Sequence, residues 1–288
     1  MLPRFDFLEP TSLAEVHAAL REYGDDARLM AGGTALVLLM RQRLVQPRVI
    51  VSLRHVPGLD AIEPLDGGVR IGALATHRRV ELHPLVRERF PALAETLQRV
   101  ATIRIRNMGT LGGNLAHADP AQDPPATLLA LGAQVQVVGP NGPRTIPLDE
   151  FFVDYYENAL APGEVLTHID IPAPPPRQAQ AFSKFLPRSV DDYATVAVAV
   201  CLRLAPDGRC EEARIGLGSV GPTPLRARAA EAILRGQELT EAVLREAGAA
   251  AAAECDPLSD IRGSAEYKRE MVKVWLVRTV RRALERAA

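Results

Sequence analysis

Two glycine-rich segments of the sequence have the composition of a ligand-binding loop. AGGTAL (31–36) and GTLGGN (109–114) each place a Gly-Gly pair beside Thr or Asn and next to a predicted helix. Glycine lets the backbone approach a ligand closely, and successive N–H groups near a helix N-terminus bind anions. Thr34, Thr110 and Asn114 can add side-chain hydrogen bonds. Because neither segment has the GK[ST] ending of a Walker loop, the pair predicts a cradle for an extended pyrophosphate.

The second segment leads into a histidine and two aspartates, which can form an acid–base unit. His117 is close in sequence to Asp119 and Asp123, but no serine or cysteine nucleophile is nearby and no second histidine has a metal-ligand spacing. We therefore expect His117 and Asp119 to support the loop, and Asp123 to accept hydrogen bonds from ligand hydroxyls. We predict no catalytic side chain and no metal site in this chain.

Two further polar residues have less distinctive surroundings. ATH (75–77) follows a predicted strand, and by chemistry alone His77 is more typical of a helix cap or a surface position than of a catalyst. Lys184 lies in an alternating segment, and this pattern favours a solvent-exposed sheet face.

A third glycine-rich motif, GLGSVG (216–221), matches the dinucleotide pattern G-x-G-x-x-G. A true dinucleotide-binding turn leads directly into a helix within an early βαβ unit. Here the motif runs into PTP (222–224), late in the chain. We therefore interpret it as the glycine-rich end of a strand.

The composition argues against several classes of function. The 288 residues include 34 basic and 35 acidic side chains, so the net charge of −1 offers no field for nucleic acid or an anionic membrane. Three cysteines without CxxC spacing argue against a disulfide framework, an iron–sulfur cluster or structural zinc on this chain. No apolar run approaches the roughly 18 residues of a membrane span, and the N-terminus lacks an apolar signal core, so we expect a cytoplasmic protein.

Apolar periodicity predicts small helices and strands in the first part of the chain. Ser12, with Glu15 three residues later, is typical of a capped helix start, and this helix should end near Tyr23. A second helix is predicted from about Thr34 to Leu44. Further helices are expected at 90–101 and 124–131, and strands at 49–53, 69–74, 133–139 and 165–172.

A proline-rich connector, PAPPPRQAQ (172–180), divides the sequence. Beyond it the pattern predicts three strands, followed from about residue 224 by three helices rich in Ala, Arg and Glu. Strands followed by a run of helices favour an α+β fold over a doubly wound parallel sheet. We expect a domain boundary between residues 174 and 175.

Five motifs of this sequence occur together in one protein family. They are AGGTAL, IGALATH, RNMGTLGGNLAHADPAQDPPATLLAL, KF–R–DDYATVAVA and GSVGPTPLRA, in this order and at suitable distances. Through them, residues 3–285 resemble the FAD-binding medium subunit of molybdenum hydroxylases. This family includes the carbon monoxide dehydrogenase medium subunit and the xanthine dehydrogenase flavin subunit.

The resemblance implies a two-domain α+β fold. Residues 1–174 would form a vanillyl-alcohol-oxidase-type FAD-binding domain with two α+β lobes, at about 1–54 and 55–174. Residues 175–288 would form a C-terminal subdomain with a three-stranded antiparallel sheet and a three-helix bundle.

The resemblance also implies which residues bind FAD. The first and second glycine-rich segments would hold the pyrophosphate, Asp123 the ribityl or ribose hydroxyls, and Tyr193 would pack against the isoalloxazine. The full expected set is Ala31, Gly32, Gly33, Thr34, Ala35, Leu36, Thr76, Ile103, Met108, Gly109, Thr110, Leu111, Gly112, Gly113, Asn114, Asp123, Leu166, Lys184 and Tyr193.

The function implied by the resemblance is electron transfer. A large molybdopterin-binding subunit would oxidise the substrate, a small subunit with two [2Fe–2S] clusters would relay the electrons, and FAD on this chain would pass them to NAD⁺, a quinone or oxygen. A dimer of heterotrimers is expected. The chain lacks the cysteine-bearing insertion of the 4-hydroxybenzoyl-CoA reductase branch, so FAD is the only cofactor expected on it. Two alternatives stay open: an independent FAD oxidoreductase with its own substrate pocket, and a non-redox nucleotide-binding scaffold.

Overall fold

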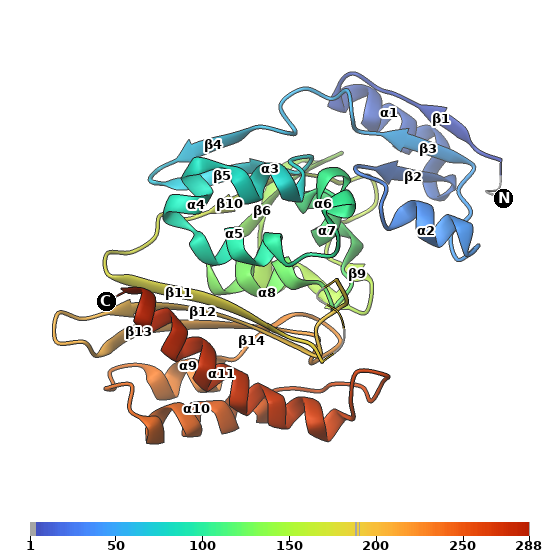
Figure 1. Ribbon diagram of the computed structural model, residues 1–288. Helices are drawn as coiled ribbons and strands as arrows, with labels where there is room; N and C mark the ends of the chain where they lie inside the picture. The colour runs from blue at the N-terminus through green and yellow to red at the C-terminus, as the bar shows by residue number, and fades with distance from the viewer. Residues whose placement is uncertain (1–3, 188, 190, 288) are drawn as a thin grey trace.

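Three main sheets, each with its own helices, follow one another along the chain (Figure 1). The computed structural model describes residues 4–187, 189 and 191–287. Arg188, which belongs to the KF–R–DDY motif, lies outside the described residues. The order of sheets and helices is that of the expected α+β fold, and the structure confirms it.

The N-terminal lobe is built on a small parallel sheet of order β1-β3-β2. Its elements are β1 (Asp6–Leu8), α1 (Leu13–Tyr23), η1 (Gly24–Asp26), β2 (Ala27–Met30), α2 (Leu36–Arg41) and β3 (Val49–Ser52). Helix α1 begins as predicted, because the Ser12 side chain accepts a hydrogen bond from the Glu15 N–H. A second hydrogen bond supports this helix start, since the Glu15 carboxylate accepts from the Thr11 N–H at 2.7 Å. In the usual capping pattern the donor would be the N–H of the cap residue, Ser12. Helix α2 is shorter than predicted.

The middle lobe is a five-stranded antiparallel sheet of order β4-β5-β10-β6-β7. Its strands are β4 (Ile62–Leu65), β5 (Gly68–Gly72), β6 (Gln134–Gly139), β7 (Gly142–Pro147) and β10 (Val165–Ile171). The helices are α3 (His77–Leu82), α4 (Pro84–Arg89), α5 (Pro91–Gln98), α6 (Ile103–Met108), α7 (Leu111–His117) and α8 (Asp123–Ala130). A short helix η2 (Leu148–Glu150) and the hairpin β8 (Phe152–Asp154) and β9 (Glu157–Asn158) complete the lobe.

The C-terminal part places three helices on an antiparallel sheet of order β11-β12-β13-β14. The strands are β11 (Gln178–Phe185), β12 (Val196–Leu204), β13 (Cys210–Gly218) and β14 (Leu225–Arg226), and the helices are α9 (Arg228–Leu234), α10 (Glu241–Ala253) and α11 (Ala265–Ala287). The three predicted strands and three helices are present. The two-residue strand β14 adds a fourth strand that was not predicted, because two residues carry no alternation to detect.

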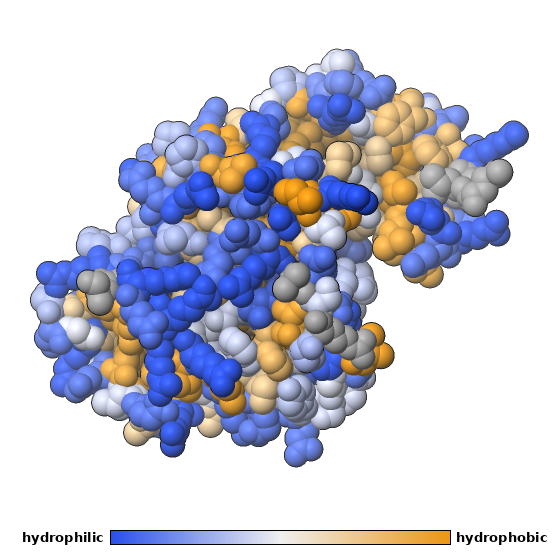
Figure 2. Space-filling model, viewed as in Figure 1, coloured by the Kyte–Doolittle hydropathy of each residue, from blue (hydrophilic) through white to orange (hydrophobic). Residues whose placement is uncertain are grey.

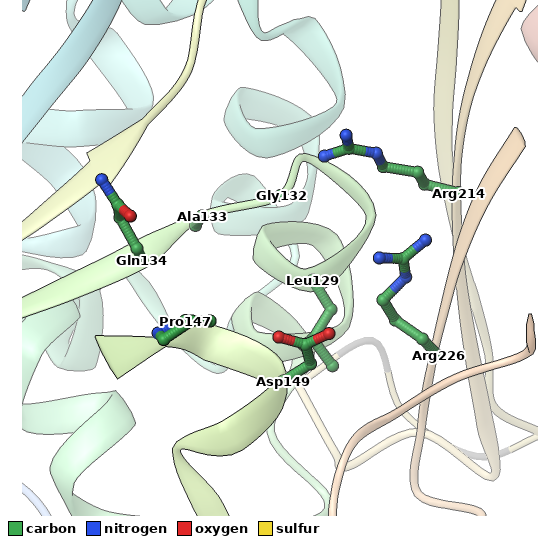
Figure 3. A pocket seen from close by; sticks show the side chains of 8 residues that line it. All are labelled: Leu129, Gly132, Ala133, Gln134, Pro147, Asp149, Arg214 and Arg226. Carbon is green, nitrogen blue, oxygen red and sulfur yellow. The ribbon is translucent and has the colours of Figure 1, made fainter. Parts of the chain in front are cut away.

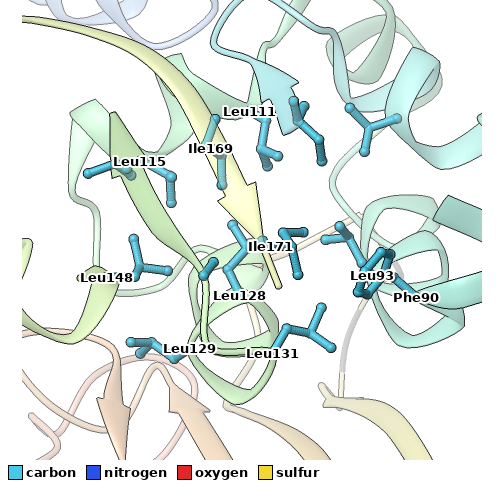
Figure 4. Close-up of a cluster of buried hydrophobic side chains, with 14 of the residues drawn as sticks. Phe90, Leu93, Leu111, Leu115, Leu128, Leu129, Leu131, Leu148, Ile169 and Ile171 are labelled. Carbon is cyan, nitrogen blue, oxygen red and sulfur yellow. The ribbon is translucent and has the colours of Figure 1, made fainter. Parts of the chain in front are cut away.

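A continuous core joins the middle lobe to the C-terminal sheet. Strand β12 alternates between two clusters: Val196 and Val198 face the C-terminal helices, whereas Ala197 and Ala199 face the core of the middle lobe. Figure 4 shows part of this second cluster, with Leu128 and Leu129 of α8 among its members. All eight residues of α8 are buried, because the C-terminal sheet covers one side of the helix, and α5, α7 and the core of the middle lobe cover the other.

Other features of the fold bear on the excluded classes of function. Gly216, in the GLGSVG motif, lies in β13, where an added Cβ would come within 1.9 Å of the Ala126 carbonyl oxygen. This glycine therefore serves close packing against α8, as its interpretation as a strand end requires. The three cysteines are buried free thiols. Among the described residues, no helix has the length and apolar character needed to cross a membrane, and no cluster of three metal-binding side chains occurs.

Candidate functional site

The two glycine-rich segments lie against each other, although more than seventy positions separate them in the sequence. An added Cβ at Gly32 would lie 1.9 Å from the carbonyl oxygen of Met108, and one at Gly113 would lie 3.4 Å from the Cβ of Ala31. A Cβ added at Gly109 would lie 3.4 Å from the Thr34 hydroxyl oxygen, so this side chain also contacts the second segment. We call these two segments, residues 31–36 and 108–114, the cradle.

The first segment of the cradle has free backbone donors. Gly33 has a φ of +70°, a conformation that glycine adopts without strain. Within the part of the chain that the structure describes, the N–H groups of residues 32–36 donate no hydrogen bond. Ala35, at the N-cap of α2, supplies no side-chain cap. Several N–H groups are therefore available to an anionic ligand.

The second segment is a helix start and not a loop, which corrects the interpretation of residues 109–114 as a backbone nest. Thr110 caps α7, and its hydroxyl accepts the Gly113 N–H at 3.1 Å. The N–H groups of Leu111 and Gly112 donate to the carbonyls of Ala75 and Ala73, both at 3.0 Å. Because these donors are already used, the segment can offer a ligand its side chains and a close approach, but not a row of free N–H groups.

The glycines of this helix start serve packing as well. An added Cβ at Gly112 would lie 2.4 Å from the Cβ of Ala73 and would push α7 away from the end of β5. Asn114, one turn into the helix, has a buried Oδ1 atom without a hydrogen-bond partner. Since buried polar atoms are normally paired, this oxygen and its amide group are candidates to contact a ligand.

The segment 73–77 completes this region and was only partly anticipated. Thr76 pairs with Thr110 in an isolated antiparallel bridge, and the His77 N–H donates to the Gly109 carbonyl at 2.9 Å. The Thr76 hydroxyl caps α3 by accepting the Arg79 N–H. Ala73 and Ala75, which hold α7 in place, were not predicted. The small residues of IGALATH (71–77) are the signal that could have indicated them.

His77 is neither a cap nor a surface residue, which corrects the prediction. Its side chain is buried with its Nδ1 unpartnered, while Thr76 provides the cap. Burial, helped by the positive charge of Arg106, lowers the pKa of His77 to about 4. The imidazole is therefore neutral at physiological pH.

Asp123 and Lys184 form a buried ion pair, so the prediction of an exposed sheet face for Lys184 is wrong. The Lys184 Nζ lies 2.7 Å from the Asp123 Oδ2, and it also donates to the Arg99 carbonyl at 3.0 Å. Alternation in β11 does not reveal that helices of the middle lobe cover this face. The second oxygen of Asp123 has no partner. Burial raises the pKa of Asp123 to about 6, against the effect of Lys184.

Tyr193 belongs to a polar cluster that brings distant segments together. The guanidinium of Arg262 lies 5.4 Å from the Tyr193 ring centre. Burial, together with the Asp119 carboxylate, raises the pKa of both Tyr193 and Tyr156. The His117 ring lies 5.3 Å from that of Tyr156. His117 and Asp119 thus take part in side-chain contacts that support the chain after α7, in agreement with their expected role.

The remaining predicted residues differ in how accessible they are. Ile103 and Met108 of α6 are exposed on 44% and 59% of their surface, which leaves them free to line a ligand groove. The Leu111 side chain is fully buried in the core of the middle lobe, and Leu166 of β10 is almost fully buried. A ligand can therefore meet Leu111 only through its backbone, whose N–H is already bonded to Ala75.

Two pockets in the described part of the chain lie away from the cradle. Figure 3 shows the first, of about 200 Å³, in which Arg214 and Arg226 approach from the C-terminal sheet. Both arginines are paired with neighbouring carboxylates, those of Glu212 and Glu231. Its lining is Leu129, Gly132, Ala133, Gln134, Pro147, Asp149, Arg214 and Arg226. A second pocket of about 300 Å³ lies between α4, α5 and β11. Neither includes a predicted cofactor residue.

Comparison with known proteins identifies the class of protein that this fold defines. Residues 3–174 match the model of the FAD binding domain in molybdopterin dehydrogenase, and residues 181–283 match that of the CO dehydrogenase flavoprotein C-terminal domain. The first of these matches covers more than half of the chain. The protein is therefore a flavoprotein whose cofactor is FAD.

Individual relatives cover the whole length of the chain. It is 41% identical to a carbon monoxide dehydrogenase medium chain of Afipia carboxidovorans, over 100% of this chain and 99% of that one. It is 36% identical to subunit alpha of the 6-hydroxypseudooxynicotine dehydrogenase complex of Paenarthrobacter nicotinovorans, over 99% and 96%. A solved carbon monoxide dehydrogenase chain of Hydrogenophaga pseudoflava superposes with a TM-score of 0.97 at 38% identity, over 100% of both chains. The chain belongs to the family of FAD-binding medium subunits of molybdenum hydroxylases.

Proposed function

We propose that the cradle binds the pyrophosphate of FAD. The observation that carries this proposal is the row of free N–H groups at residues 32–36, directly opposite the N-terminus of α7. Asn114 lies at the same place, and its side-chain NH2 group can donate to a phosphate oxygen, since its Oδ1 has no partner within the chain that would fix the amide in another orientation. A diphosphate needs donors on several sides, and these groups together with the Thr34 and Thr110 hydroxyls supply them.

We assign Thr76, Met108 and Ile103 to cofactor contacts, because Thr76 pairs with Thr110, the Met108 carbonyl adjoins Gly32, and Ile103 is an exposed apolar residue of the same helix as Met108. Tyr193, exposed beside Arg262, is assigned to the flavin ring. For Asp123 and Lys184 we propose contact only through the unpartnered Asp123 oxygen, because the other polar atoms of the pair bind each other or the backbone. The buried side chains of Leu111 and Leu166 would pack behind the residues that contact the cofactor and so help to determine the shape of its binding site.

The chain would serve as the electron-transfer subunit of a molybdenum-dependent dehydrogenase. FAD accepts electrons one at a time and delivers them in pairs, which suits it to connect iron–sulfur clusters with a two-electron acceptor. The chain's own residues would bind the cofactor, orient its ring and restrict what reaches it. In the region of the cradle, His77 is buried and His117 packs on Tyr156, so neither is placed as a general acid or base.

The proposed partners are a large molybdopterin-binding subunit and a small subunit with two [2Fe–2S] clusters, assembled as a dimer of heterotrimers in the cytoplasm. Support comes from relatives that are themselves named as a medium chain or as a subunit of a dehydrogenase complex. In this arrangement the substrate binds to another subunit.

We also propose residues 1–174 as the FAD-binding domain, with lobes at about 1–54 and 55–174, and residues 175–288 as the C-terminal subdomain.

Flavin spectroscopy tests the proposal. The purified chain, alone or together with its partners, should contain one FAD per chain and show flavin absorbance, and reduced iron–sulfur clusters of the complex should reduce that flavin in stopped flow. A colourless chain that binds no added FAD would contradict the proposal and favour a nucleotide-binding scaffold. Turnover of a substrate by the isolated chain would instead favour an independent flavoenzyme.

A further inference from the structure

A buried carboxylate binds the two tyrosines of the polar cluster at the end of α7. The side chain of Asp119 is only 6% exposed, and no basic side chain in the described part of the chain forms an ion pair with it. Its Oδ1 accepts the Ala121 N–H at 2.9 Å, and the hydroxyls of Tyr156 and Tyr193 donate to the same carboxylate. Because burial of an uncompensated charge is costly, these three hydrogen bonds are what stabilises Asp119 at this position.

Both tyrosines are anchored by their hydroxyls while their rings stay partly exposed. Tyr156 is 59% exposed and Tyr193 is 44% exposed. Most of the surface seen in Figure 2 is hydrophilic, and large exposed rings are exceptions to this pattern. A surface tyrosine usually packs its ring on the protein and directs its hydroxyl to water. Here the hydroxyls bind a buried acid instead, which leaves part of each ring open to a ligand.

The ring of Tyr193 is also held from one side. The guanidinium carbon of Arg262 lies over this ring, 5.4 Å from its centre, and Nη2 of the same arginine lies 2.7 Å from the Asp192 Oδ1. The Thr195 hydroxyl donates to the Arg262 carbonyl at 3.3 Å, so the arginine is tied to the segment that contains Tyr193. One face of the ring is therefore covered by a cation, which leaves the opposite face for a flat ligand.

Helix α7 connects Asp119 to the cradle. The helix starts beside Thr110 in the cradle and has seven residues, after which Ala118 turns the chain with a φ of +52°. The Tyr156 N–H donates to the Ala118 carbonyl at 3.1 Å, and Figure 1 shows β9 beside this end of the helix. Seven helical residues span roughly 10 Å, which is comparable to the extent of the ribityl chain between the pyrophosphate and the ring of FAD. The separation of the two ends of α7 therefore suits one FAD molecule that contacts both.

We propose that Asp119 is a positioning residue that fixes the ring of Tyr193 in the orientation in which it contacts the flavin. The proposal rests on the proposed FAD-binding function, in which Tyr193 is assigned to the flavin ring. Asp119 would act through Tyr193 and would not touch the cofactor itself, because three donors of the chain already bind its carboxylate. Tyr156 binds the same acid and so keeps the hairpin β8–β9 beside Tyr193.

The first test uses the apoprotein, so it does not depend on FAD. Asp119→Ala removes the acceptor of both hydroxyls, whereas Asp119→Asn keeps the shape of the side chain and removes its charge. A phenol that donates to a carboxylate absorbs at longer wavelength than one that donates to water. Both variants should therefore shift the tyrosine band to shorter wavelength in near-ultraviolet difference spectra. Asp191→Asn is the matched control and should give no shift, because Asp191 is an exposed acid in the same segment as Tyr193.

The second test uses the FAD-loaded full chain after free FAD has been removed. A tyrosine ring in contact with a flavin quenches its fluorescence by electron transfer, so the fluorescence per bound FAD reports where the ring of Tyr193 lies. Asp119→Ala should raise this fluorescence severalfold, and Asp119→Glu, which restores a carboxylate, should recover most of the quenching. In a Tyr193→Phe background, Asp119→Ala should have no further effect, because its action passes through Tyr193.

The outcomes separate this proposal from the proposed function. Wild-type protein that binds no FAD would overturn the function, whereas Asp119→Ala protein that binds FAD with wild-type fluorescence would overturn only the positioning role. A fluorescence increase of the same size in the Tyr193→Phe background would also overturn it, because Asp119 would then act through the fold and not through the ring. Where Asp119→Ala does not fold, Asp119→Asn gives the same comparison. Tyrosine spectra that the Asp119 variants leave unchanged would contradict the hydrogen bonds themselves.

Discussion

Asp123 and Lys184 are proposed to lie at the cofactor site, but most of their polar atoms are already bonded to other groups of the protein. Both side chains are at most 7% exposed, and their ion pair links the start of α8 to β11. A buried pair of this kind adds little net stability, but removal of one partner leaves an uncompensated buried charge. The pair therefore constrains how the middle lobe meets the C-terminal sheet, and the free oxygen of Asp123 is what it can offer to a cofactor.

The buried carboxyl of Asp123 should give the apoprotein a characteristic pH dependence. Its pKa is about 6 in the folded state, above the ordinary 3.8, so the folded state binds more protons between these values. The contribution of this carboxyl to the free energy of unfolding is fully present below about pH 4. It is lost as the pH rises through 6, by up to about 3 kcal/mol. Urea unfolding at pH 4 to 7 should show this trend in wild type relative to Asp123→Asn/Lys184→Met. Parallel curves for the two proteins would contradict it, and exposed Glu88→Gln serves as control.

His77 should act in the opposite direction. Its pKa is about 4 in the folded state and 6.5 ordinarily, so the folded state binds fewer protons between these values. Stability from this residue is present above pH 6.5 and is lost as the pH falls toward 4, again by up to about 3 kcal/mol. His77→Gln should therefore lose less stability than wild type on acidification, as measured by urea unfolding. An unchanged pH profile would show that the buried imidazole accepts a proton without cost.

The glycines of the two cradle segments have different structural roles. In the segment 31–36, glycine accompanies free N–H groups and a positive φ. In α7, Gly112 instead allows the helix to pack against Ala73. The same local composition thus gives a donor-rich turn in one place and a closely packed helix start in the other. Contacts from another segment account for the difference.

Gly32→Ala should abolish FAD binding. A methyl group there would lie 1.9 Å from a backbone oxygen of the facing segment, so the two halves of the cradle must separate. We expect loss of flavin absorbance with the chain still folded, because Gly32 is in no strand or helix and its contact is confined to the cradle. FAD content per chain and the circular dichroism spectrum test this. Gly208→Asn is the control, since Gly208 has open space around it and Asn tolerates its φ of +86°. Normal FAD content in Gly32→Ala would refute the role of the cradle.

The whole molecule depends on a core that crosses the proposed domain boundary. Phe182 and alternate residues of β12 pack with the helices of the middle lobe, and Arg282 of α11 donates to the Phe182 carbonyl at 2.8 Å. Arg286 of α11 also pairs with Glu95 of α5 at 2.8 Å. The C-terminal part therefore covers one side of the FAD-binding part and does not merely follow it.

A fragment of residues 1–174 should accordingly fail to fold as a stable unit. Without the C-terminal sheet, α8 loses cover on one side, although all eight of its residues are buried in the full chain. Exposure of this apolar helix with the unpaired Asp123 should cause aggregation, strong binding of a hydrophobic dye and a loss of cooperative unfolding. Dye fluorescence and thermal unfolding, with the full chain as reference, measure this. A soluble fragment with a sharp transition would show that the boundary separates independent domains.

Local pattern was sufficient for most elements and for the class of cofactor. Ser12 and the apolar period after it predicted α1, the alternation of β6 and β10 predicted two strands, and five motifs in order indicated an FAD-binding medium subunit. Such signals work because a helix cap, a strand face and a glycine turn depend on residues a few positions apart. Local patterns could not predict the burial of His77 and Lys184. They also could not predict that Ala73 and Ala75 accept the α7 N–H groups, or that the apolar face of α2 points outward. Each depends on a partner, or on the lack of one, that is distant in sequence and adjacent only in the folded chain. The glycine pairs therefore indicated a pyrophosphate ligand and the five motifs together indicated FAD, whereas only the packing of the lobes determined that residues 32–36 keep their backbone donors free.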